Sequence, residues 1–202
     1  MVLRAVPLPH EAMEHNASVL VDLLAALTET SSEFVVVGGL AAGYHGRLRA
    51  TIDVDLLVPK RKLKPLAAAM RRRGYETKAF PDMVRVYRGT PESVADLVAR
   101  ESSPTLKEAA RHVETVTLLG KRVPMVTPGA FVALKFHAAV SPTRQLGDKY
   151  QDIVDVERVV TRKLAPDQRA LALTIAERMY PGAPEDLARM LDDLAAGRPV
   201  KL

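Results

Sequence analysis

The stretch that decides the fold is EFVVVGGLAAGYHGRLRATIDVDLLV, residues 33–58. It opens with a β-branched run that stops at Gly38-Gly39, a pattern typical of a buried strand that ends at a tight turn. The small residues that follow favour a short helix packed closely on a sheet. Residues 51–58 alternate polar and apolar side chains before they become wholly apolar. They therefore predict a second strand whose first half presents one face to something polar.

Asp53 and Asp55 are the chemically informative residues of this second strand. Side chains two residues apart on a strand point to the same face, about 6–7 Å apart, so both carboxylates can converge on one metal ion. Burying two carboxylates is costly unless a cation compensates them, and Mg²⁺ prefers oxygen ligands together with substrate phosphates. The alternative interpretation is an exposed edge strand whose acids face water.

The residues between the two strands suit a bound phosphate. Gly38 and Gly39 expose bare backbone just before a predicted helix, where phosphate oxygens can approach the helix N-terminus. Arg49 and Thr51 share strand parity with Asp53 and Asp55, so they can face the same pocket or simply pair with the acids. A glycine pair alone is weak evidence, and the spacing of the whole group carries the interpretation.

Working outward, the pattern predicts an α/β (α+β) fold: a mixed sheet flanked by helices, followed by a helical C-terminal half. We expect an α/β core over residues 1–127 and a helical region over residues 128–202 packed on it. The expected helices cover residues 10–28, 59–74, 104–113, 129–139, 147–161, 166–179 and 184–196, and the further strands cover 76–80, 83–87, 94–98 and a hairpin at 116–126.

Composition narrows the class of protein. The 202 residues are 48% hydrophobic, enough to bury a core. The absence of cysteine excludes a disulfide framework, a thiolate zinc site and a cysteine nucleophile. No apolar run reaches the roughly 18 residues of a membrane span, and the N-terminal segment lacks a signal-peptide core. We therefore expect a cytoplasmic protein with no membrane partner.

The positive charge is concentrated in one segment. The net charge is +5, and seven Lys or Arg residues lie between Pro59 and Tyr75 without an acid among them. Removing those seven charges from +5 leaves the rest of the chain at −2. The segment is either the solvated face of a helix or a contact for phosphate or RNA.

Residues 38–55, GGLAAGYHGRLRATIDVD, resemble the signature of the nucleotidyltransferase superfamily, in its branch of AbiEii-like and other small bacterial (MNT-like) transferases. In that superfamily the glycines end one strand and begin a helix. The two aspartates on the next strand bind the metal that holds a nucleoside triphosphate, and a third carboxylate follows on a later strand. Asp96 within residues 94–98 looks like that third carboxylate, unless it is a turn residue.

The resemblance continues into the helical half. Residues 131–139 and 148–155 are similar to the family's helix with an embedded lysine and to a following helix rich in lysine and aspartate. The resemblance gives Lys135 a contact with nucleotide phosphates or with an active-site carboxylate. Asp152 and Asp155 lie three apart on one helix face, where they either support the site or form salt bridges with nearby basic side chains such as Lys135.

The resemblance implies a metal-dependent enzyme that moves a nucleoside monophosphate from a nucleoside triphosphate to an acceptor hydroxyl of RNA, protein or a small molecule. Asp53, Asp55 and Asp96 would be catalytic and would hold Mg²⁺ or Mn²⁺. The phosphate-binding set would be Gly38, Gly39, Arg49, Thr51 and Lys135. A toxin-like role in a toxin–antitoxin or phage-defence pair is one implied context. The alternatives are a non-catalytic nucleotide-binding module and an RNA-binding regulatory protein, and oligomeric state stays open.

Overall fold

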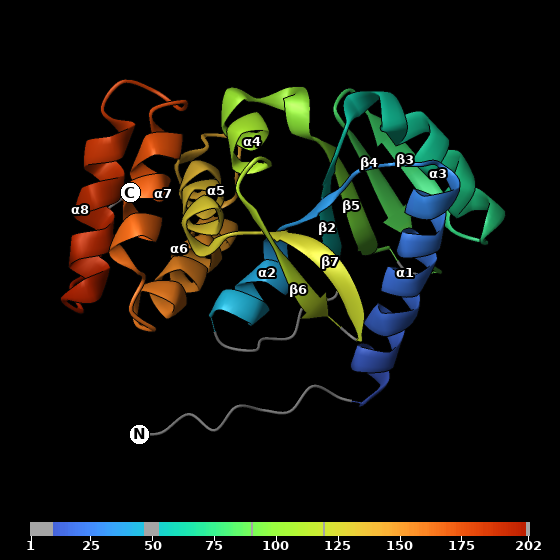
Figure 1. The fold of residues 1–202 in the computed structure, drawn as a ribbon, viewed down its shortest axis with the longest axis horizontal. Coiled ribbons are helices and arrows are strands. Elements are labelled where there is room, and N and C mark those ends of the chain that lie inside the picture. The colour runs from blue at the N-terminus through green and yellow to red at the C-terminus, as the bar shows by residue number, and fades with distance from the viewer. Residues whose placement is uncertain (1–9, 47–52, 90, 119, 201–202) are drawn as a thin grey trace.

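The β-branched and alternating runs of the sequence form one seven-stranded sheet in the computed structural model, which describes residues 10–46, 53–89, 91–118 and 120–200 (Figure 1). The strand order is β3-β4-β5-β2-β1-β7-β6. β2 pairs in parallel with β5, and β1 pairs in parallel with β7, whereas the other neighbours are antiparallel. The strands are β1 (Val35–Val36), β2 (Val54–Val58), β3 (Glu76–Phe80), β4 (Met83–Tyr87), β5 (Ser93–Ala99), β6 (Val113–Leu118) and β7 (Lys121–Val126).

The helices account for most of the remaining described chain. The predicted helix from Pro59 begins as a 3-10 turn, and the one predicted over 104–113 ends early because Val113 already begins β6. The helices are α1 (His10–Glu29), α2 (Gly38–His45), α3 (Leu63–Arg72), α4 (Pro104–Ala109), α5 (Pro128–Val140), α6 (Leu146–Val160), α7 (Pro166–Ala176) and α8 (Ala183–Ala195), with 3-10 turns η1 (Lys60–Lys62) and η2 (Arg100–Ser102).

Helices α1 and α3 cover one face of the sheet, over strands β2 to β5. Alternate strand residues such as Leu56, Val84, Val86 and Leu97 are buried on that face. Each such side chain stabilises the fold by roughly 1.5–3 kcal/mol when fully removed from water. The opposite residues of β4 and β5 are polar or half-exposed. The period of two in the sequence therefore leaves one face of this part of the sheet without a helical cover among the described residues.

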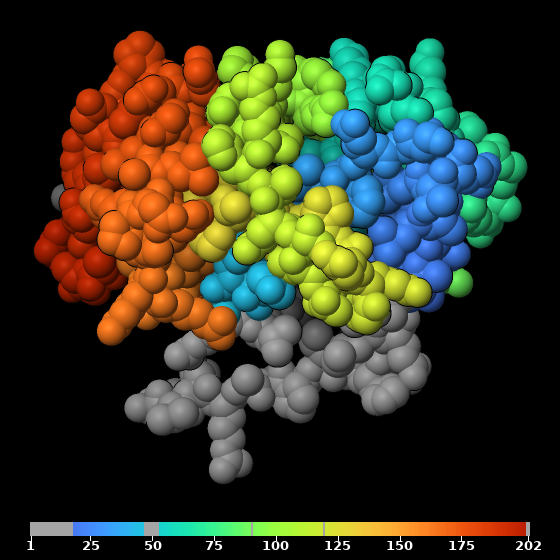
Figure 2. Space-filling model, in the orientation of Figure 1, coloured from blue at the N-terminus to red at the C-terminus, as the bar shows by residue number. Residues whose placement is uncertain are grey.

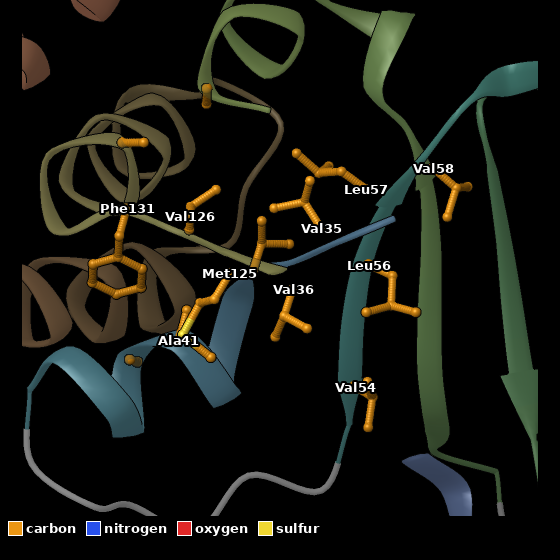
Figure 3. Close-up of a cluster of buried hydrophobic side chains, with 14 of the residues drawn as sticks. Val35, Val36, Ala41, Val54, Leu56, Leu57, Val58, Met125, Val126 and Phe131 are labelled. Carbon is orange, nitrogen blue, oxygen red and sulfur yellow. The ribbon is translucent and has the colours of Figure 1, made fainter. Parts of the chain in front are cut away.

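Helix α5 joins the sheet to the other C-terminal helices. It is apolar on almost all sides, and Phe131 is only 1% exposed, as a helix surrounded by other elements requires. Figure 3 shows Phe131 together with Val36, Leu56 and Met125 from three neighbouring strands. Helices α6, α7 and α8 lie on the far side of α5 from the sheet (Figure 1). Among the described helices, none combines the length and apolarity needed to cross a membrane.

The basic segment is largely used to dock α3. Its predicted apolar stripe of Leu63, Leu66, Ala67 and Met70 is buried as expected. Five of its seven cations bind neighbouring segments. Arg72 and Arg73 pair with Glu29 of α1, the latter at 2.8 Å, and Lys60 pairs with Asp82 at 2.7 Å. Lys62 donates to the carbonyl of Thr30 at 2.6 Å, and Arg71 donates to Thr77 of β3 at 2.6 Å. These contacts favour the helix-face interpretation over a nucleic-acid contact.

Candidate active site

The turn at Gly38 brings the start of α2 against β2. Gly38 adopts a positive φ of 61°, a conformation that side chains other than glycine rarely adopt. A Cβ at this position would lie 1.7 Å from Asp55 Oδ2, closer than any real contact. The backbone N–H of Val37 donates to the carbonyl of Asp55 at 3.0 Å, and the N–H of Gly39 donates to the Asp55 carboxylate. Gly38 is therefore required for the backbone to approach this carboxylate.

Asp55 and Asp96 lie side by side on neighbouring strands. In the parallel pairing of β2 with β5, Asp55 is directly in register with Asp96, so both side chains leave the same face of the sheet. Asp53 lies immediately before β2, and its charge acts on both other carboxylates. The structure thus brings together the three acidic residues singled out from the sequence. Asp96 is a strand residue rather than a turn residue.

The carboxylates repel one another in a partly dehydrated setting. The pKa of Asp55 is raised to about 7, chiefly by burial and also by the charges of Asp53 and Asp96, while Lys135 and the Gly39 N–H oppose the shift. Burial also raises the pKa of Asp96, while Arg85 opposes that shift. Arg85 Nε lies 3.4 Å from Asp96 Oδ2. Asp96 Oδ1 is a buried acceptor without a hydrogen-bond donor. A bound cation or a set of hydrogen-bond donors would offset both the repulsion between the carboxylates and the burial of an acceptor without a donor.

A hard divalent ion fits this donor set in part. Asp53, Asp55 and Asp96 offer carboxylate oxygens, the ligand type that Mg²⁺ and Mn²⁺ prefer, and Asp96 Oδ1 is an unused acceptor. Within the described part of the chain, no three acidic or histidine side chains are arranged so that they hold an ion by themselves. Mg²⁺ typically takes one or two carboxylates and completes its shell with water and substrate phosphates. The residues therefore fit an ion that arrives with a phosphate ligand.

Lys135 of α5 is held by the two aspartates of α6. Its Nζ lies 2.8 Å from Asp152 Oδ1 and 2.9 Å from Asp155 Oδ2, and both carboxylates are only 1% exposed. Arg144 Nε lies 2.5 Å from Asp152, and Arg158 Nη1 lies 3.7 Å from Asp155. Asp152 and Asp155 thus form the salt bridges that were one of the two interpretations of their spacing. The lysine charge still reaches the site, because it lowers the pKa of Asp55.

His45, at the end of α2, fixes that helix to the sheet. Its Nε2 donates to the carbonyl of Val126 at 2.7 Å, and its ring packs against Phe131 of α5. Burial lowers the pKa of His45, whereas the hydrogen bond to Val126 and the charge of Glu114 oppose that shift. Arg49 and Thr51, two of the predicted phosphate ligands, lie outside the described residues.

Arg85 lies beside these carboxylates but was not predicted from the sequence. The alternation of residues 83–87 places Arg85 on the face opposite the buried Val84 and Val86, and this orientation could be predicted from the sequence. Its position beside Asp96 depends on the register of β4 with β5, which the sequence does not specify. Arg85 is therefore a site residue that becomes visible only in the folded protein.

Two cavities lie away from these carboxylates. One of about 670 Å³ is lined by residues of α5, α6 and α8, among them Phe136, Lys149 and Met190. Part of its polar lining is already paired: Arg189 lies 3.2 Å from Asp186, and Tyr180 donates to Asp186 at 3.1 Å. We place the candidate site at Asp55 and Asp96 because it gathers acidic side chains with raised pKa values, a feature that matters more here than the volume of a cavity.

Asp55→Asn is expected to stabilise the metal-free protein above pH 7 and to have little effect near pH 4. The pKa of Asp55 rises from its ordinary 3.8 to about 7 in the folded protein, so between these values the folded state holds a proton that the unfolded state has lost. The contribution of this carboxyl to stability is full below the lower value and is lost as pH rises through the upper one. Urea unfolding of both proteins across this range measures the effect, and parallel pH profiles would contradict it.

Known proteins resemble this chain in fold rather than in sequence. No protein-family model matches it, and no curated protein matches it. The crystal structure of ANT(2'')-Ia in complex with adenylyl-2''-tobramycin matches with a TM-score of 0.59 at 18% identity, over 81% of this chain and 98% of that one. An antigenic nucleotidyltransferase-like protein from Paracoccidioides brasiliensis matches with a TM-score of 0.54 at 16% identity, over 89% and 93%. The fold is therefore nucleotidyltransferase-like, as the sequence predicted.

Proposed function

We propose that this chain is a nucleotidyltransferase. An acceptor hydroxyl oxygen would attack the α-phosphorus of a nucleoside triphosphate, the bond from that phosphorus to the bridging oxygen would break, and pyrophosphate would leave with the electron pair. The observation that carries the proposal is the in-register pair of Asp55 and Asp96 beside the N-terminus of α2. Such an arrangement acts by positioning and by electrostatic stabilisation.

The donor phosphates would lie at the start of α2. Gly38 and Gly39 bring the backbone to Asp55, and the N-terminus of an eight-residue helix favours an anion there. Arg49, Thr51 and Lys135 complete the proposed phosphate-binding set. Lys135 is already paired with Asp152 and Asp155. It would therefore contribute positive charge near the phosphates without binding them directly.

The acidic residues would hold the metal and the acceptor. Asp53, Asp55 and Asp96 would bind Mg²⁺ or Mn²⁺, which when bound would neutralise phosphate charge and polarise the reacting groups. Asp96 would complete that site or take the proton from the acceptor hydroxyl. Its raised pKa, which burial causes, suits a proton acceptor better than an ordinary exposed aspartate would.

The finer identity rests on the sequence resemblance. We infer an AbiEii-like or MNT-like transferase with its catalytic core in residues 1–127 and its helical region in 128–202, acting in the cytoplasm, with a toxin–antitoxin or defence pair as its context. The matching ANT(2'')-Ia structure holds an adenylyl group joined to tobramycin. A small-molecule acceptor therefore stands beside RNA and protein as a class to be tested.

Calorimetric titration with ATP, CTP, GTP and UTP, with and without Mg²⁺, tests the proposal. We expect Mg²⁺-dependent binding of at least one nucleotide, weakened about 100-fold in Asp55→Asn and Asp96→Asn. Asp192→Asn is the matched control, because Asp192 carries the same charge but pairs on the surface with Arg169. Absence of binding by the folded wild type, or equal binding by all variants, would overturn the proposal.

A further inference from the structure

We propose that Lys78, Phe80 and Arg85 form a second phosphate-binding site, on the open face of β3 and β4, that receives the acceptor. The acceptor would carry a phosphate group beside an aromatic base, as a nucleotide at the end of a single nucleic-acid strand does. This inference rests on the proposed function, since it takes Asp55 and Asp96 as the reaction centre.

A row of charged side chains crosses the sheet at one level. Lys78 is in register with Arg85, Arg85 with Asp96, and Asp96 with Asp55, so the four side chains leave the same face. Adjacent strands lie about 4.8 Å apart, which places Lys78 about 10 Å from Asp96 along this row. The order is therefore two acids at the candidate reaction centre followed by two bases toward the β3 edge.

This face is accessible. Helix α3 packs on the other side of β3 and β4, where Thr77, Val84 and Val86 point toward it. On the open side, the Arg85 side chain is 45% exposed and the Phe80 residue 36% exposed. Lys78 is also exposed among the described residues. A ligand can therefore reach all three groups without movement of a helix.

The three groups combine positive charge with an aromatic ring. Lys78 Nζ lies 5.4 Å and Arg85 Cζ 5.7 Å from the centre of the Phe80 ring, so both cations are held beside it. Asp96 faces Arg85, and Glu76 lies on the same face of β3 as Lys78, so the two cations are partly balanced. A phosphate between the cations with a base stacked on Phe80 would use both properties, as single-strand binding sites do.

The position of these groups fits the acceptor rather than the donor. The donor phosphates are assigned to the α2 side of Asp55, at Gly38 and Gly39. Arg85 and Lys78 lie on the opposite side of the carboxylate pair, where an attacking hydroxyl would have to enter for an in-line displacement. An aminoglycoside, which is polycationic, would meet two like charges here, whereas a phosphate would meet two opposite ones.

Binding of a short fluorescent single-stranded RNA, without nucleoside triphosphate, tests this site. We expect Lys78→Gln/Arg85→Gln to bind about 10-fold more weakly at low salt. Its slope of log K against log salt should be shallower by about 0.7, the value for one phosphate that is no longer neutralised. Phe80→Leu should weaken RNA binding but not the binding of inorganic polyphosphate. The matched control is Lys121→Gln/Arg122→Gln, on the exposed β6–β7 hairpin (Figure 2), which removes the same charge elsewhere.

Two results would overturn the inference: equal losses in the Lys78/Arg85 and Lys121/Arg122 variants, or wild-type protein that binds tobramycin in preference to RNA. Arg85→Lys, which retains the charge, should recover part of the affinity and guards against loss through misfolding. Nucleotide binding measured on the same preparations separates this inference from the proposed function. If the single variant Lys78→Gln, which leaves the Arg85–Asp96 pair intact, keeps Mg²⁺-dependent nucleotide binding but binds RNA more weakly, both hold. If RNA binding is unchanged while nucleotide binding is present, only the acceptor site fails.

Discussion

Gly38→Ala is expected to destabilise the protein by about 3–5 kcal/mol, whereas Gly43→Ala in the same helix should stabilise it by about 0.5–1 kcal/mol. At Gly38 the added methyl group would meet Asp55 Oδ2 at 1.7 Å, and the positive φ is strained for alanine. At Gly43 the added methyl group would point into open space, with no atom of a neighbouring element within 4 Å, so alanine brings only its better helix propensity.

Urea unfolding of the two variants measures this contrast. Because domains of this size are stable by only about 5–15 kcal/mol, the loss at Gly38 is a large part of the total. A loss at Gly43 equal to that at Gly38 would show that the contact with Asp55 does not explain the loss at Gly38. Similar stability in both would show that Asp55 moves away from Gly38 at little cost, and the close approach would then have no structural role.

Lys135→Met is expected to destabilise the protein by about 3–5 kcal/mol. The substitution leaves Asp152 and Asp155 buried without the ammonium group that lies within 2.9 Å of each. Removing one partner of a buried ion pair costs more than the pair contributes, because the remaining charge stays dehydrated. Arg144 and Arg158 lessen the loss only in part, since both are partly exposed.

The triple variant Lys135→Met/Asp152→Asn/Asp155→Asn serves as the control for this prediction. It removes the stranded charges together with the lysine, so it should recover much of the stability lost in Lys135→Met. Calorimetric nucleotide titration of both proteins provides the second measurement. A small loss of stability in Lys135→Met with a large loss of nucleotide affinity would show that Lys135 contacts phosphate directly rather than through the α5–α6 charge cluster.

The sequence predicted those parts of the fold that depend on local pattern. Strands β3 and β4 were bounded correctly because period-two alternation meets the turn residues Pro81 and Asp82. The helices after Pro128 were found because their apolar residues recur at helical spacing. Strand β1 proved only two residues long, since Val37 already occupies the N-cap position of α2, although its N–H still donates to Asp55 of β2. The start of α2 at Gly38 therefore sets the end of β1, which the apolar run 34–37 alone does not define.

The site was predictable in its residues but not in its geometry. Asp55 and Asp96 stood out as acids inside apolar strands, yet their direct pairing depends on β2 lying parallel to β5, a contact between strands far apart in sequence. The same holds for Arg85, whose place beside Asp96 follows from strand register. For Lys135, sequence spacing allowed two partners, phosphate or aspartate, and only the packing of α5 on α6 shows the aspartates in contact.

The in-register carboxylates also bear on how long the protein survives. Ligands that bind only the folded state stabilise it in proportion to the logarithm of their concentration. A site that gathers like charges is costly while empty, so a bound cation and phosphate would relieve that cost as well as add contacts. The ligand-free form would open more often at α2 and β2 and be degraded sooner. For the nucleotidyltransferase proposed above, the supply of nucleotide and metal would thus affect the protein's lifetime as well as its proposed activity.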